Sequence, residues 1–161
     1  MGGNAMTKEQ TYLLSVPIME DNVTTETRNC YLEYLREIQA QRVWLAVGQN
    51  MLLQKDRTEF LLQLSEKLRF FEKNGLETGI WIRGFGFGGE LNRNDAEVAA
   101  GWTSIRSVFE DKSTKIDAFC PEDPGFMEAY ESLVREIAGI QPRLIMMDDD
   151  LCLSVRPGLG C

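Results

Sequence analysis

The sequence predicts an α/β fold built on a parallel sheet, and two patterns carry this prediction. Segments with the composition of strands alternate with segments whose apolar residues recur at helical spacing. The last strand segment is the run Leu144–Met147, whose continuous apolar character is typical of a strand buried on both faces. The alternation implies a parallel sheet with right-handed crossovers. Because the alternation is strict and most connections are short, we expect the strands to pair sequentially, in the order 1-2-3-4, with the helices on one outer face.

The strands and helices can be assigned from these patterns in chain order. The predicted strands are Thr11–Ile18, Arg42–Gly48, Thr78–Arg83 and the run that begins at Arg143. The predicted helices run from a cap at Thr24 or Thr25 to Gln41, from a cap at Asp56 to Asn74, and from Asp123-Pro124-Gly125 to Gln141-Pro142. Asn74-Gly75 has the residues of a left-handed helix C-cap.

A long connection separates the third strand from the third helix. Within it, Ile105–Phe109 and Lys115–Phe119 flank a polar turn, which predicts a β-hairpin insertion. Four strand–helix units are too few to close an eight-stranded barrel of ~250 residues. Four units are enough for a small open sheet or for half a barrel. Residues 1–161 are expected to form a single domain.

Composition narrows the class of function. The net charge of −8 argues against nucleic acid or an anionic membrane as the main partner. The N-terminal residues lack the basic and apolar regions of a signal peptide, and no apolar run is long enough to span a bilayer, so a cytoplasmic location is expected. Histidine is absent, which excludes Ser-His-Asp catalysis and histidine-ligated metal sites and leaves carboxylates as the acid–base groups. The four cysteines are expected to be reduced thiols.

Three consecutive carboxylates, Asp148, Asp149 and Asp150, follow the last strand, at the end where parallel folds place their ligands. Like charges at this spacing raise the pKa of at least one of them, so that one carboxyl group can donate a proton while its neighbour acts as a base. The same cluster can instead bind a hard cation such as Mg²⁺, or it can be a solvated acidic loop.

A glycine-rich segment follows the third strand. Gly84, Gly86 and Gly89 satisfy the pattern GxGxxG of nucleotide-binding loops, but the polar segment after Gly89 does not begin a helix as that motif requires. The favoured interpretation is a sharp loop that displays Phe85 and Phe87 over a pocket. Polar and aromatic side chains at successive strand ends are expected to converge on one rim and contact a sugar, and the candidates are Glu20, Asp21, Asn50, Trp81, Arg83 and Phe85.

Three segments resemble a known family. Asp117–Pro124 contains a Cys-Pro before a helix, Leu144–Leu151 is a strand that ends in a triple Asp, and Gly160-Cys161 begins a Gly-Cys element. Together they are similar to bacterial TIM-barrel glycoside hydrolases of the β-galactosidase-like kind. Leu151-Cys152 stands where that pattern has an aromatic-Arg pair, which is a departure from it.

The resemblance implies the N-terminal half of a (β/α)₈ barrel, apparently truncated after its fourth strand. It places the catalytic acid on Asp148–Asp150 and implies a carbohydrate substrate, without cofactor or metal. Glycosidases of this kind use two carboxyl groups, and the second would come from a later strand, so little activity is expected of this chain alone. The unpaired edges of a half barrel are expected to favour self-association. The alternative is a complete small α/β domain that binds a divalent cation or a nucleotide through Asp148–Asp150.

Overall fold

A computed structural model of the chain describes residues 13–82, 101–102, 104–108, 114–119 and 122–147. Its centre is a four-stranded parallel sheet in the order β1-β2-β3-β6. The strands are β1 (Ser15–Met19), β2 (Arg42–Val47), β3 (Glu77–Ile82) and β6 (Ile145–Met147). Each of them coincides with a predicted strand to within a few residues at either end. The predicted sequential order and parallel direction are therefore confirmed.

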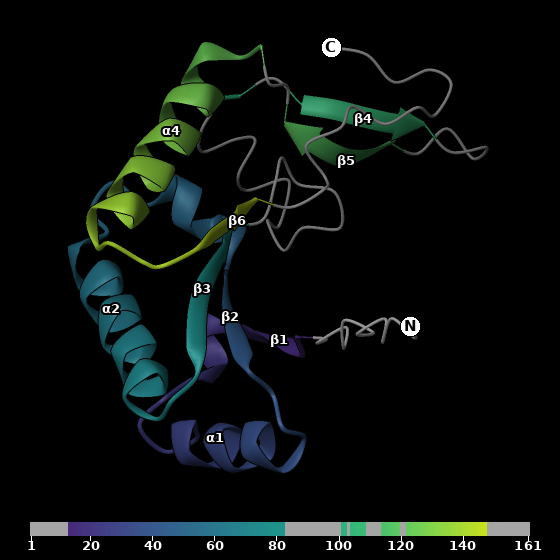
Figure 1. Cartoon of the computed structure of the whole chain (residues 1–161). Coiled ribbons are helices and arrows are strands. Elements are labelled where there is room, and N and C mark those ends of the chain that lie inside the picture. Colours follow the sequence, from purple (N-terminus) through teal and green to yellow (C-terminus); the bar gives the residue numbers. More distant parts are fainter. Residues whose placement is uncertain (1–12, 83–100, 103, 109–113, 120–121, 148–161) are drawn as a thin grey trace, which may run out of the picture.

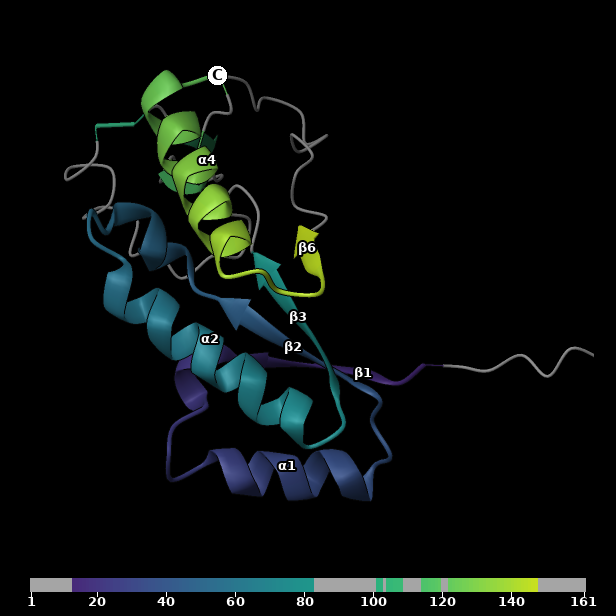
Figure 2. The ribbon, with the colours of Figure 1, turned by 60° about the vertical axis from the view of Figure 1, so that its left-hand side comes forward.

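In the described part of the chain three α-helices cover the sheet, and Figures 1 and 2 show them on the same side of it. They are α1 (Arg28–Glu37), α2 (Thr58–Lys73) and α4 (Pro124–Gly139). Short 3-10 helices, η1 (Glu20–Asn22) and η2 (Gln49–Leu53), follow β1 and β2. Within the described residues, no helix has the length and apolar character needed to cross a bilayer.

The first helix is shorter than the sequence predicts, at both ends. The Thr24 hydroxyl accepts hydrogen bonds from the backbone N–H groups of Glu26 and Thr27, at 3.2 and 3.3 Å, so the predicted cap forms a separate turn before Arg28. At the other end Gln39 adopts φ 56°, a left-handed conformation that stops the helix before Gln41.

The ends of the other two helices lie within a few residues of the predicted ones. Asp123 Oδ1 accepts from the backbone N–H groups of Gly125 and Phe126 at 2.9 and 3.0 Å, which caps α4. Asp56 lies one residue before the N-cap Arg57 of α2, and its Oδ1 accepts from the N–H of Thr58 at 3.0 Å, so the predicted cap is displaced by one residue. Gly75 follows the C-terminus of α2 with φ 86°, the left-handed conformation expected of a C-cap glycine.

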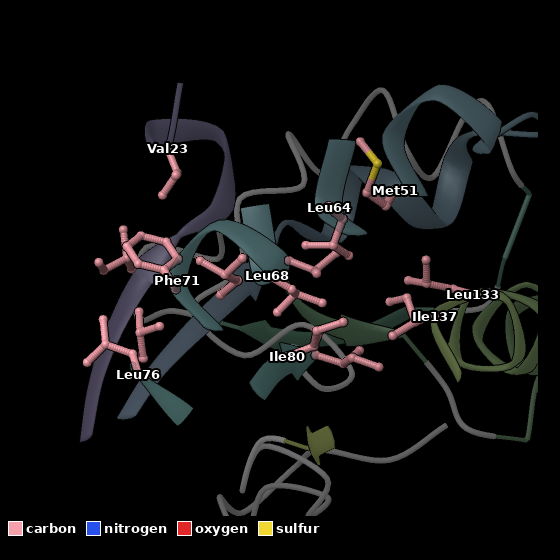
Figure 3. Packing of buried hydrophobic residues seen from close by; sticks show 14 of the residues in the cluster. Val23, Met51, Leu64, Leu68, Phe71, Leu76, Ile80, Leu133 and Ile137 are labelled. Atoms are coloured by element: carbon pink, nitrogen blue, oxygen red, sulfur yellow. The ribbon is translucent and has the colours of Figure 1, made fainter. Parts of the chain in front are cut away.

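The hydrophobic core lies between the sheet and the helices. Alternate residues of β2 and β3 face the helices and are almost fully buried, with Leu45 beside Ile80 in the register of the two strands. Figure 3 shows Leu64, Leu68 and Phe71 of α2 packed in a row on this face, with Leu133 and Ile137 of α4 near Ile80. The helices thus contribute apolar stripes at the spacing of one helical face.

One prediction about the sheet is wrong. The run Leu144–Met147 was expected to be buried on both faces, but Ile145 is 38% exposed and Met147 is 42% exposed. Within the described sheet β6 pairs only with β3 and is an edge strand, so no neighbour covers its far side. Apolar composition alone therefore does not show that both faces of a strand are covered.

The predicted hairpin is present. Strands β4 (Ser104–Val108) and β5 (Thr114–Phe119) pair antiparallel in a separate two-stranded sheet. Figure 1 shows this hairpin beside the N-terminal end of α4, apart from the parallel sheet.

Candidate functional site

The C-terminal edge of the parallel sheet carries four of the predicted site residues. Glu20 and Asp21 lie in η1 directly after β1, Asn50 lies in η2 after β2, and Trp81 is the penultimate residue of β3. Because these strands are parallel, their C-terminal ends share one edge, as the sequence predicts. The other candidates, Arg83, Phe85 and Asp148–Asp150, lie outside the described residues.

The Glu20 carboxylate points toward the helix layer. Its Oε2 accepts a hydrogen bond from Lys67 Nζ of α2 at 2.6 Å, and its backbone oxygen accepts from the same ammonium at 2.8 Å. Both side chains are well shielded, with 12% of Glu20 and 18% of Lys67 exposed. Removal of either partner would leave the other charge partly buried and unpaired, which is destabilising. The Glu20–Lys67 pair is therefore a structural contact between η1 and α2.

Glu20 and Lys67 line a cavity of about 710 Å³ between the start of α1 and α2, and Asp21 lies on its wall. Carboxylates predominate among its other charged residues, which are Glu26, Arg28, Asp56, Glu59 and Glu66. A hydrogen bond from the Thr24 hydroxyl lowers the pKa of Glu26, and the backbone N–H of Thr58 lowers that of Asp56. Both groups therefore stay ionised at neutral pH. No group of three or more carboxylates or thiols within the described part of the chain is arranged to hold a metal ion.

The sheet face opposite the helices carries two indole rings. Trp44 of β2 lies directly across from Gly79 of β3, and the absence of a side chain at Gly79 lets the Trp44 ring extend over β3. Trp81 stands on the same face two residues further along β3, in register with Ala46 and Met146. The indole nitrogen of Trp81 is buried and has no hydrogen-bond partner among the described residues. An indole N–H is a donor that is usually paired when buried.

Sequence reasoning selected Trp81 but missed Trp44. The signal for Trp44 was present in the alternation of β2, where Val43, Leu45 and Val47 form the helix-facing set and leave Trp44 on the other face. At the N-terminal edge of that face Arg42 donates two hydrogen bonds to Glu77 Oε2, at 2.6 and 2.9 Å, and its guanidinium lies over the Trp44 ring. In the described strands this face therefore runs from an ion pair at one edge to Trp81 near the other.

A search of protein-family models finds none that matches this sequence, and no curated protein matches it. The site must accordingly be interpreted from its own chemistry. The C-terminal edge combines an indole ring with an unpaired N–H donor and polar side chains in the adjacent loops. An aromatic face beside hydrogen-bonding groups is suited to a ligand with both apolar and hydroxyl surfaces.

Proposed function

We propose that this chain contributes four successive strands of a (β/α)₈-type barrel related to glycoside hydrolases, with the helices that connect them, and that it binds carbohydrate at the C-terminal edge of its sheet. The supporting observation is the sequential order β1-β2-β3-β6 of parallel strands with α1, α2 and α4 on one side. This is the arrangement of a barrel wall, in which one face of the sheet turns inward and the other carries the helices.

The inward face of such a wall would be the face that bears Trp44 and Trp81. Trp81 lies nearest the C-terminal edge, where barrel enzymes bind their substrates. Its ring would stack on a sugar, and its indole N–H would donate to a ring oxygen or hydroxyl. Asp148–Asp150 directly follow β6 in the sequence. In this proposal they lie at the same edge and supply the acid–base group, with Asn50, Arg83 and Phe85 as further sugar contacts.

Binding is the stronger part of the proposal, and little hydrolysis is expected. A glycosidase needs two carboxyl groups about 5–5.5 Å apart for retention or about 6.5–9.5 Å apart for inversion. On the inward face of the described strands the only carboxylate is Glu77, which lies at the N-terminal edge in its ion pair with Arg42. Glu20 lies at the correct edge but is bound to Lys67 on the helix side.

The alternative is a small α/β domain that binds a cation or a nucleotide through Asp148–Asp150. Open sheets of that kind bind their ligand at a switch point, where the strand order reverses. The described sheet has a sequential order without such a reversal, which favours the barrel proposal.

The barrel proposal also has a consequence for association. The sheet has two edges that no described strand pairs, and exposed apolar residues lie at both of them: Leu13 and Leu14 before β1, and Ile145 and Met147 in β6. We propose that the isolated chain self-associates through these edges.

Carbohydrate binding can be tested by NMR titration of the purified chain with galactose, glucose and their methyl glycosides. We expect saturable shifts of indole N–H signals, which Trp81→Phe weakens because phenylalanine keeps a ring but cannot donate. Tyr34→Phe is the matched control, because Tyr34 is an exposed aromatic residue on α1, away from the sheet edge. Aryl glycosides assayed in parallel should show little turnover, and Asp149→Asn should abolish any that is found. Saturable shifts by Mg²⁺ or ATP with none by any sugar would contradict the proposal and support the alternative.

A further inference from the structure

Arg57 is the buried cation of the described part of the chain. It directly precedes α2, and only 6% of the residue is exposed. An arginine stays charged at any physiological pH, so its burial requires partners that compensate both the charge and the N–H donors.

The structure provides these partners for part of the guanidinium. Nε donates to the backbone oxygen of Met51 at 2.7 Å, and Nη1 donates to Glu136 Oε1 at 2.8 Å and to Ser132 Oγ at 3.4 Å. The contacts join η2, α2 and α4. The remaining amino group, Nη2, makes no hydrogen bond to any described residue. Nη2 is not among the buried side-chain atoms without a partner in the described residues, so part of its surface is accessible and an acceptor from outside the chain can reach it.

Arg57 lines a cavity that can hold such an acceptor. The cavity has a volume of about 540 Å³ and lies between η2 and the first half of α4. Its size is within the range of small-molecule sites. Trp102 forms part of the wall, and Lys55 adds a second cation that has no ion pair within the described residues.

We propose that this cavity binds a small oxyanion, a carboxylate or a phosphate group, as the acceptor for Arg57 Nη2. A guanidinium recognises carboxylate and phosphate oxygens through planar, charge-assisted hydrogen bonds. Lys55 supplies the charge that balances the ligand, because Glu136 already balances Arg57. Glu128 also lines the cavity, and its negative charge selects a monoanion over a polyanion. The site is separate from the sheet face that bears Trp81 and does not depend on the carbohydrate proposal.

The test is a titration of the purified chain with inorganic phosphate and, separately, with acetate, at constant ionic strength set by sodium chloride. The arginine side-chain N–H signals are followed by NMR. We expect a saturable shift of the Arg57 signals with one of the two anions, and the stronger response identifies the ligand group.

Three variants make the result specific. Lys55→Gln should weaken binding by about tenfold, the effect of losing one charged hydrogen bond. Ala129→Leu adds bulk to the cavity wall and should abolish the shift, while its urea midpoint verifies that the chain is folded. Lys73→Gln, at the far end of α2, is the control and should bind as the parent does.

Two results would overturn the proposal. The first is the absence of a saturable shift with either anion, which would mean that water completes the hydrogen bonds of Nη2. The second is an equal shift in the Ala129→Leu variant, which would place the anion outside the cavity.

Discussion

Substitution of Gly79 by alanine tests the packing on the sheet face opposite the helices. In most strands this change is favourable, by about 0.5–1 kcal/mol, because glycine loses more conformational freedom on folding. Here a Cβ at position 79 would lie 2.2 Å from Cζ3 and 2.4 Å from Cε3 of Trp44. The ring would have to move by about 1.2 Å to reach an ordinary contact of 3.4 Å, while Arg42 lies over it. Overpacking of this kind costs about 1–3 kcal/mol, so we expect a net loss of roughly 1–2 kcal/mol.

The assay is urea unfolding followed by far-ultraviolet circular dichroism, which does not depend on the fluorescence of Trp44. If the indole ring is the cause, Gly79→Ala should be neutral or stabilising in a Trp44→Leu background. Gly139→Ala is the control, because no atom lies within 4 Å of its added Cβ and alanine favours the helix. A Gly79→Ala chain as stable as the parent, or one equally destabilised without Trp44, would refute the reasoning.

Three further predictions concern a helix cap, pH and the sheet edge. Asp123→Ala should lower the free energy of unfolding by about 1 kcal/mol in a urea titration, since two backbone N–H groups of α4 lose their acceptor. The backbone N–H of Thr58 lowers the pKa of Asp56 from its ordinary value of 3.8. The ionised Asp56 therefore contributes stability above pH 3.8, and this contribution is lost as pH falls through the lowered pKa. Asp56→Asn should flatten this acidic part of the curve of unfolding free energy against pH. Ile145→Lys should reduce self-association measured by light scattering, and Leu62→Lys, at an exposed apolar site on α2, should not.

Much of the fold could be predicted because its determinants are local. Strand–helix alternation predicts the sequential parallel sheet, and Asp123, Asp56 and Gly75 mark helix ends through contacts within a few residues. Capping residues act on neighbouring backbone groups, so their effect can be inferred from the sequence alone.

The remainder depends on contacts that are distant in the sequence. Glu20 was selected as a sugar contact, but its position is set by Lys67, 47 residues later. Arg57 was not selected at all, and its partner Glu136 lies 79 residues away. No sequence pattern shows which of many charged residues meet across the helix layer. The same limit explains β6, whose apolar run indicated burial on both faces although Ile145 and Met147 are exposed.

The two ends of the sheet face opposite the helices have different roles, and this difference bears on where a ligand can bind. Toward the N-terminal edge, Arg42 pairs with Glu77 and lies over the Trp44 ring, which packs against Gly79. The polar groups of this ion pair therefore have their partners within the chain. Toward the C-terminal edge, Trp81 keeps a buried N–H that no described residue accepts. A buried donor without an acceptor costs about 1–3 kcal/mol, and a ligand oxygen can recover that energy. The half that contains Trp44 and the Arg42–Glu77 ion pair therefore stabilises the sheet. The half that contains Trp81 lacks a hydrogen-bond acceptor, and we expect a ligand to bind there.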